Sequence, residues 1–440
     1  MNIYFHIDEL KRDAIVASAL YRKLEGTNHK ITFGNRTIAP LLKYFHDAFD
    51  IIVLPRPHFM YDFWGKDVLN WKQQFIMLST ESLGIICKDH HVMAKTLLEN
   101  TYFEGNQDYV QKISAFCVWG EKQKLALKEY SRLDLTKVYP IGHPRHDSLC
   151  QKKMTTKYEQ KRTLKIGFVT RTNSLNDYYG RSAIRGFEVL FDDHFNYEYI
   201  NRTTGKKLVS DRRDSNPKDN MIVQLIDIEN LLKVLKKLSS LNFELSIRCH
   251  PKEDSNEWIY LFSKCGINAE IADNSIPITH WLMDKDKVIG PPSTSFYDAA
   301  MCKVEPISIE NLDSTRRKYI GRLWEDNNQL MEHIYKPESI DELVQYLKKN
   351  RDFPSKEVMS ILKEEANFPY CSNSLDKFIT ICKKVNLNSH NLIFSNLYPI
   401  ISFLYTKAWQ IKNIVIGRKE NSSQYSLGRK NKRFIMSLTK

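Results

Sequence analysis

The chain has 440 residues, 42% of them hydrophobic, and a formal net charge of +13. At roughly 150 residues per domain, this length predicts two or three domains with sizeable cores. The composition excludes a polytopic membrane protein, a collagen and a wholly disordered chain. The charge leaves nucleic acid, an anionic membrane surface and acidic substrates as possible partners.

The positive charge is concentrated toward the C-terminal end. The segment from Lys407 onward holds nine basic residues and one acid, Glu420, so it carries +8 and the preceding residues only +5. The larger part of the chain is therefore not strongly basic. Because this basic tail contains no recognisable nucleic-acid-binding motif, we expect no nucleic acid partner.

Eight cysteines are scattered along the sequence, and no two of them form a CxxC pair. Disulfide and metal frameworks need closer clustering, so we expect reduced, mostly buried thiols, as in a cytoplasmic protein. The first residues lack the basic and apolar regions of a secretory signal. No stretch offers about 18 uninterrupted apolar residues, so a membrane-spanning helix is not expected.

Short apolar runs alternate with helical patterns over residues 1–150. The predicted strands are Ile3–His6, Lys30–Phe33, Asp50–Leu54, Phe75–Ser79, Ala115–Trp119 and Lys137–Ile141. Between them, Glu9–Lys23 and Glu121–Tyr130 carry apolar residues at helical spacing. Strands that alternate with helices indicate crossover connections and a parallel sheet. Residues 1–150 are therefore predicted to form a Rossmann-like domain.

The same alternation starts again after Gln151–Arg162, a polar and basic stretch that we interpret as an interdomain linker. The predicted strands are Lys165–Thr170, Phe243–Cys249, Ala269–Ala272, Lys287–Gly290 and Glu305–Ile309, and the predicted helices are Asn230–Leu241, Pro277–Met283, Thr294–Cys302 and Ile340–Lys349. The charged segment Asn201–Asn220 predicts a loop or insertion. Residues 163–385 should form a second Rossmann-like domain, with both parallel sheets facing a cleft at their carboxyl ends.

Residues 386–440 have a different character. Leu392–Tyr405 is apolar and aromatic, interrupted by Asn396 and Pro399, and the basic tail follows it. This stretch is too short to span a bilayer but could lie in the interface, with the Lys/Arg cluster contacting anionic lipids. The alternative is a C-terminal helix packed on the first domain and followed by a disordered basic tail.

A basic cluster closes the predicted strand Phe243–Cys249. It consists of Arg248, His250 and Lys252. An imidazole at a strand end could donate to a phosphate oxygen, and two neighbouring cations would favour an anionic ligand. A histidine that only holds its own turn is the alternative.

A hydroxyl cluster begins the predicted helix Thr294–Cys302. Ser293, Thr294 and Ser295 supply three hydroxyls at a helix start, where backbone N–H groups also suit a phosphate. An ordinary helix cap without a ligand is the alternative. Because this cluster lies about 40 residues after His250 in the same domain, we predict that both could converge on one phosphate.

Two further constellations belong to the first domain or its border. Glu81 follows the strand Phe75–Ser79, where a carboxylate could act as general base on an acceptor hydroxyl. A solvated loop residue is the alternative. Arg145 and Asp147 lie at the domain junction and could order the hinge as an ion pair or reach substrate. We favour the structural role for this pair.

Common nucleotide and metal motifs do not explain the sequence. No Walker A, HExxH, GxSxG or GxGxxG motif occurs in a suitable context. Asp284-Lys285-Asp286 has the spacing of a metal-binding DxD motif, but it precedes the strand Lys287–Gly290 and is interpreted as a solvated turn. We therefore predict no metal site.

Five motifs occur in a characteristic order: Glu81 after a strand, Val118-Trp119-Gly120 with Gln123, Gly142-x-Pro144-Arg145-x-Asp147, His250-Pro251, and Ser293-Thr294-Ser295 at a helix start. Over residues 1–385, this set resembles the bacterial surface carbohydrate (surface polysaccharide) biosynthesis proteins. That family is similar to capsule Kdo transferases, bacterial sialyltransferases and CDP-glycerol glycerophosphotransferases. One departure is Ser82, which follows Glu81 where relatives tend to have glycine.

The resemblance implies a GT-B fold, a cytidine-nucleotide donor and no metal. It would make His250 and Ser293–Ser295 the donor-phosphate site and place Glu81 on the acceptor side. The predicted activity is transfer of a sugar, Kdo or another acidic sugar, from a CMP donor to a glycan or glycolipid acceptor at the inner face of the cytoplasmic membrane. Alternatives are a CDP-glycerol glycerophosphotransferase, a nucleotide-sugar 2-epimerase and a non-catalytic scaffold of a polysaccharide assembly complex.

Overall fold

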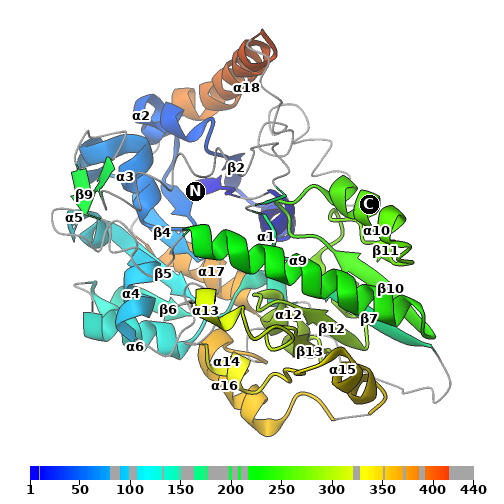
Figure 1. Cartoon of the computed structure of the whole chain (residues 1–440). Helices are drawn as coiled ribbons and strands as arrows, with labels where there is room; N and C mark the ends of the chain where they lie inside the picture. The colour runs from blue at the N-terminus through cyan, green and yellow to red at the C-terminus, as the bar shows by residue number, and fades with distance from the viewer. Residues whose placement is uncertain are drawn as a thin grey trace. The chain divides into compact units, whose positions relative to one another are not determined.

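The computed structural model describes residues 1–8, 10–79, 90–98, 107–130, 133–147, 149, 163–173, 175–176, 198–200, 207–209, 217–320, 328–349, 352–369, 373–385 and 392–415. The chain divides into two compact units, each with its own parallel sheet (Figure 1). Unit 1 comprises Met1–Gln151, Asn201–Lys206 and Lys363–Lys440, and unit 2 comprises Lys152–Ile200 and Lys207–Leu362. The prediction of two α/β domains with parallel sheets is confirmed.

Unit 1 is built on a six-stranded sheet in the spatial order β2-β1-β3-β4-β5-β6. Its strands are β1 (Asn2–His6), β2 (Lys30–Gly34), β3 (Ile51–Leu54), β4 (Gln74–Leu78), β5 (Ile113–Val118) and β6 (Val138–Pro140). Its helices include α1 (Leu10–Leu24), α2 (Leu42–Phe45), α3 (His58–Trp64), α4 (His90–Leu98), α5 (Gln107–Gln111) and α6 (Glu121–Tyr130). All neighbouring strands pair in parallel, as the alternation of strands and helices predicts.

Three helices from the end of the chain also belong wholly or partly to unit 1. They are α16 (Lys356–Ala366), which crosses the unit boundary, α17 (Ser374–Lys384) and α18 (Leu392–Val415). Phe378 and Cys382 of α17 are fully buried in the same hydrophobic cluster as Ile3 and Phe5 of β1. The observed division differs from the predicted second domain, 163–385, and separate tail, 386–440, because unit 2 ends at Leu362 and α17 and α18 belong to unit 1. The apolar side chains of α17 are the reason, since they pack in the core of unit 1.

Unit 2 contains a five-stranded parallel sheet in the order β11-β10-β7-β12-β13. Its strands are β7 (Leu164–Val169), β10 (Phe243–Arg248), β11 (Glu270–Ile271), β12 (Lys287–Gly290) and β13 (Glu305–Ser308). Its helices include α9 (Pro217–Ser239), α10 (Ser255–Cys265), α11 (Ile278–Leu282), α12 (Ser295–Met301), α13 (Arg317–Ile320), α14 (Gln329–Glu332) and α15 (Ile340–Leu347). A short antiparallel pair, β8 (Glu198–Ile200) and β9 (Lys207–Val209), is also present.

The core of unit 2 lies between its sheet and the helix α9, which runs along the sheet in Figure 1. Leu231, Leu235 and Leu238 of α9 are fully buried against a cluster that includes Phe168 of β7 and Ile247 of β10. Burial of each such side chain contributes about 1.5–3 kcal/mol to folding. This packing holds the carboxyl ends of the central strands in fixed positions.

The predicted loop over Asn201–Asn220 is wrong at its C-terminal end. Helix α9 begins at Pro217, thirteen residues before the predicted helix start at Asn230. Proline suits the first turn of a helix because its missing N–H has no intrahelical partner there, and Asp219 adds a favourable charge near the helix N-terminus. The predicted linker Gln151–Arg162 lies outside the described residues.

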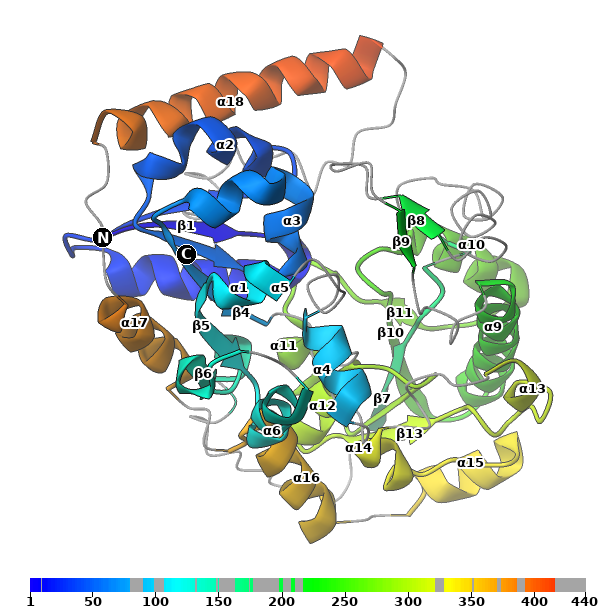
Figure 2. The ribbon, with the colours of Figure 1, turned by 90° about the vertical axis from the view of Figure 1, so that its left-hand side faces the viewer.

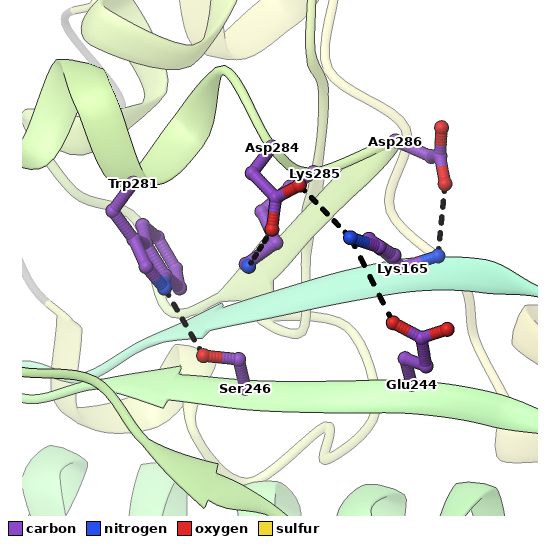
Figure 3. A network of polar contacts seen from close by, with 7 residues as sticks. All are labelled: Lys165, Glu244, Ser246, Trp281, Asp284, Lys285 and Asp286. Carbon is purple, nitrogen blue, oxygen red and sulfur yellow. Dashed lines mark hydrogen bonds and ion pairs between the residues drawn. The ribbon is translucent and has the colours of Figure 1, made fainter.

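Asp284 and Asp286 lie at the amino-terminal edge of this sheet, where their carboxylates bind Lys165 (Figure 3). The Lys165 ammonium lies 2.9 Å from Asp284, and the Lys165 backbone N–H donates to Asp286 at 2.8 Å. Both acids therefore join β7 to the turn before β12. This arrangement agrees with the interpretation of the DxD-like sequence as a turn, although the turn is bonded to the sheet.

Burial of α17 in unit 1 predicts the effect of a core substitution. Phe378→Ala removes a fully buried ring and should lower the free energy of unfolding by about 3–5 kcal/mol. Thermal denaturation of the purified variant measures the loss. Lys377→Ala on the exposed side of the same helix is the matched control and should change stability by less than about 0.5 kcal/mol. Equal melting temperatures for both variants would contradict the docking of α17.

Candidate functional site

The strand order of unit 2 defines one position at which consecutive connections diverge. The chain passes from β7 to β10, which pairs with one side of β7, and later to β12, which pairs with the other side of β7. In open parallel sheets, ligands bind outside the carboxyl ends of the strands at such a switch point. The loops after β7, β10 and β12 meet there, and these loops contain the predicted phosphate-site residues.

The approach of β12 to β7 at this edge requires a glycine. A Cβ added to Gly290, the last residue of β12, would lie 2.6 Å from the carbonyl oxygen of Val169. The two loops that follow are also bonded directly, since the Arg171 guanidinium donates to the carbonyl oxygen of Pro292 at 3.4 Å. The position of Ser293 therefore depends on contacts with the β7 loop.

A buried carboxylate joins the β7 and β10 loops. Glu253 is 1% exposed and accepts hydrogen bonds from the Thr170 hydroxyl, the Thr172 backbone N–H and, at 3.1 Å, the Trp258 indole N–H. Burial raises the pKa of Glu253, while these donors oppose the rise. An acid that accepts three internal hydrogen bonds is an organising group of the loop rather than a solvated side chain.

His250 is positioned by this network through its backbone. Its N–H donates to the Thr170 hydroxyl oxygen at 3.0 Å, so Thr170 links His250 to Glu253. The ring Nδ1 accepts the backbone N–H of Lys252 at 3.2 Å. In the neutral imidazole the proton is therefore assigned to Nε2, which makes Nε2 the hydrogen-bond donor. The ring is partly exposed at the strand end.

The two cations of the basic cluster have different environments. Arg248 is buried, and its guanidinium donates to the backbone carbonyl oxygens of Asp273, at 3.2 Å, and Ile276. Burial lowers the pKa of Arg248 to about 10. The guanidinium thus orders the loop before α11, whereas Lys252 is exposed near His250. The ligand role predicted for Arg248 remains a prediction, and its described contacts are structural.

The hydroxyl cluster forms a tight turn at the start of α12. Ser293 Oγ accepts the backbone N–H of Ser295 at 3.2 Å and lies 3.3 Å from Ser295 Oγ. Thr294 is exposed and its side chain makes no capping hydrogen bond. The turn follows β12 directly, as predicted, and its loop is bonded to Arg171 of the β7 loop. Unit 2 thus places His250 and Ser293–Ser295 at the carboxyl ends of β10 and β12, the two strands that flank β7.

Sequence reasoning missed three members of this network, namely Thr170, Arg171 and Glu253. Thr170 and Arg171 directly follow β7, and polar residues at the end of a buried strand were an available signal. Glu253 follows the basic cluster, where an acid is easily interpreted as a solvated partner of Lys252. Only its tertiary burial identifies it.

In unit 1, Glu81 lies outside the described residues, and the strand before it is well defined. The carbonyl oxygen of Ser79 accepts the indole N–H of Trp119 at 2.9 Å. Gln123 Oε1 in turn accepts the backbone N–H of Trp119 at 2.6 Å. The Trp119–Gln123 motif therefore fixes the end of β4, two residues before Glu81.

Arg145 and Asp147 have separate structural contacts in unit 1. The Arg145 guanidinium lies 5.0 Å from the Trp119 ring, and its Nε–H donates to His146 Nε2 at 3.0 Å. Asp147 accepts the backbone N–H groups of Ser374 and Leu375 at 3.1 and 3.0 Å, at the start of α17. Burial raises the pKa of Asp147. These contacts are structural ones within unit 1, and the hinge ion pair and the substrate contact considered from the sequence stay predictions.

Neither a metal centre nor a membrane span is found in the part of the chain that the structure describes. Within it, no group of three or more His, Cys, Asp or Glu side chains is placed to hold a metal ion. The helices described there do not include one that is both long and apolar enough to cross a membrane.

Comparisons with known proteins identify the fold. No family model matches the sequence, and no curated protein matches it. Among solved structures, the wall teichoic acid polymerase TagF (H444N variant) is similar with a TM-score of 0.50 and 12% identity, over 88% of this chain and 89% of that one. UDP-GlcNAc 2-epimerases from Methanocaldococcus jannaschii and Neisseria meningitidis give TM-scores of 0.47, at 11% and 10% identity. They cover 87% of this chain and 99% and 100% of theirs. Together with its two parallel sheets, the likeness to TagF shows that the chain has a GT-B-like fold.

Proposed function

We propose that the protein is a glycosyltransferase of cell-surface polysaccharide or glycolipid biosynthesis. It transfers a sugar, Kdo or another acidic sugar, from a CMP-activated donor to a glycan acceptor, and it uses no metal ion. The observation that supports this proposal is that His250 and the Ser293–Ser295 turn follow the carboxyl ends of β10 and β12, on either side of β7, in a GT-B-like fold.

The donor phosphate is bound by groups that are already in position. A transferase without a metal must stabilise the leaving nucleotide phosphate with fixed donors and cations. Suitable groups are His250 Nε2–H, the hydroxyls of Ser293 and Thr294, and the Lys252 ammonium, on the two loops that are each bonded to the loop after β7. Arg248 donates to two backbone carbonyls of the β11–α11 loop, so in this proposal it positions that loop and adds positive charge near the phosphate.

Glu81 is the candidate general base on the acceptor side. It takes the proton of an acceptor hydroxyl whose oxygen forms the new bond to the anomeric carbon. The bond from that carbon to the phosphate oxygen breaks, and the nucleotide leaves with the electron pair. The support for this assignment is its place in the sequence, two residues after Ser79, which directly follows β4 and is bonded to Trp119.

The same proposal includes a peripheral location on the inner face of the cytoplasmic membrane. Glycolipid acceptors have their hydrophobic part in the bilayer, so an enzyme that acts on them gains from surface binding. The +8 charge from Lys407 onward suits an anionic leaflet.

A second candidate is transfer of glycerol phosphate from CDP-glycerol. It is favoured by the fold likeness to TagF, a wall teichoic acid polymerase. The same phosphate site serves both reactions, because each donor carries a cytidine nucleotide. Product analysis after incubation with each donor separates the two.

The first prediction for the donor site concerns nucleotide preference. In a thermal-shift screen, CMP and CDP should raise the melting temperature, and UDP and GDP should not, because a ligand that binds only the folded state stabilises it.

The role of His250 is tested by substitution. His250→Asn keeps an acceptor for the Lys252 N–H but removes the Nε2 donor, so kcat/KM for the donor should fall roughly 10- to 100-fold. His250→Gln, which restores a donor near Nε2, should recover part of the rate. A clear preference for UDP or GDP, or full activity of His250→Asn, would remove the donor-site assignment.

The second prediction concerns Glu253 as a positioning residue. In Glu253→Gln, an N–H₂ group replaces one carboxylate oxygen and faces a hydrogen-bond donor. The free energy of unfolding should therefore fall by about 1–3 kcal/mol. Measured well below the melting temperature, donor KM should rise while kcat changes less, because the loops that hold the phosphate are displaced. Glu257→Gln on the exposed face of α10 is the control. An unchanged KM would restrict Glu253 to a stabilising role.

The third prediction tests the base. Glu81→Gln should reduce transfer by at least about 100-fold while leaving the thermal shift with CMP near the wild-type value. The removal of one carboxylate proton acceptor accounts for the loss, and donor binding in unit 2 does not depend on it. Survival of activity would make Glu81 an ordinary loop residue.

A further inference from the structure

Helix α18 is held on unit 1 by one face. Tyr398 is fully buried, and its hydroxyl donates to the carbonyl oxygen of Ile38 at 3.2 Å. Its ring packs edge-on against Phe49, with 5.2 Å between centroids. Ser402 and Thr406, one and two turns further along, are also buried. Tyr398, Ser402 and Thr406 are spaced four residues apart, so they lie on one face of the helix, which is the docked face. Figure 2 shows α18 beside α2.

The opposite face of α18 is apolar and exposed. Ile393, Leu397, Ile400 and Leu404 are 69%, 40%, 58% and 60% exposed. At 3.6 residues per turn, their spacing of four, three and four places them in one stripe. This stripe lies about 190° around the helix axis from the centre of the docked face. We call it the outer stripe.

The outer stripe is followed directly by positive charge. Lys407 comes one turn after Leu404, and the segment from Lys407 onward carries +8. A helix with an exposed apolar face and a basic continuation has the composition of an element that lies in a membrane interface. The described part of α18 is not apolar enough to span a membrane, so it would lie along the surface.

We propose that the outer stripe of α18 is the membrane-contact surface of this protein and that its occupant is an anionic lipid bilayer. Leu397, Ile400 and Leu404 enter the headgroup boundary, and the basic residues after them contact lipid phosphates. Tyr398 keeps the helix docked, so binding needs no release of α18 from unit 1. This inference deepens the location part of the proposed function and is independent of which group the enzyme transfers.

A second copy of the chain fits the stripe less well than a bilayer. It would bring another segment of net charge +8 to the same surface, whereas an anionic bilayer supplies the opposite charge. A second copy and a bilayer would both bury the apolar side chains of the outer stripe, so the charge decides between these two occupants.

The test is binding of the full chain to lipid vesicles. The variant Leu397→Ser, Ile400→Ser and Leu404→Ser combined should fold like the wild type, because all three side chains are exposed. Co-sedimentation with vesicles of equal parts phosphatidylglycerol and phosphatidylcholine should show a partition coefficient reduced by roughly tenfold or more. Vesicles of phosphatidylcholine alone should bind the wild type weakly, since they lack the negative charge.

The matched control is Ile259→Ser with Tyr260→Ser on α10, which removes two exposed apolar side chains elsewhere. It should bind vesicles like the wild type. If the triple variant also binds like the wild type, the outer stripe is not the contact and only the basic tail acts. If the wild type is a dimer by light scattering and the triple variant a monomer with unchanged vesicle binding, the occupant is a second copy.

Failure of the wild type to bind either kind of vesicle would overturn this inference and the proposed location together. Transfer to a soluble acceptor, measured in the same preparation, would still report the proposed chemistry. The two failures are thus separated by one pair of measurements.

Discussion

The carboxylate of Glu253 is the interaction on which the arrangement of the candidate site depends. It accepts three hydrogen bonds, two from the loop after β7 and one from α10, and it is almost completely buried. A buried carboxylate is costly unless its oxygens are fully bonded, so these donors offset the cost only in one geometry. Thr170 links Glu253 to His250, because its hydroxyl donates to the carboxylate and accepts the backbone N–H of His250.

Two features complete the same edge from the other side of β7. Gly290 allows the close approach of β12, and Arg171 binds the carbonyl of Pro292. The imidazole of His250 and the Ser293 turn thus belong to loops that are each tied to β7. Groups positioned before a ligand arrives need little reorganisation during a reaction, which is the arrangement that electrostatic catalysis requires.

Much of the fold could be predicted from the sequence, because each strand is a short apolar run and each helix has regular spacing. The same local logic placed His250 and Ser293 at strand ends. It could not identify the partners of Arg248, since the loop that supplies its two carbonyls follows another strand. Asp147 is a similar case, because it binds the start of α17 more than two hundred residues later. Long-range contacts of this kind leave no periodic trace in the sequence.

Helix α18 shows why local pattern alone could not choose between packing on the first domain and contacting a membrane. Its sequence is apolar on nearly every side, so the pattern does not show which face is docked. The structure separates the faces through Tyr398, whose ring and hydroxyl both bind unit 1. Docking and an exposed apolar stripe then coexist on one helix. Since both are fixed to the same backbone, a surface that binds the stripe would also set the orientation of unit 1 toward that surface.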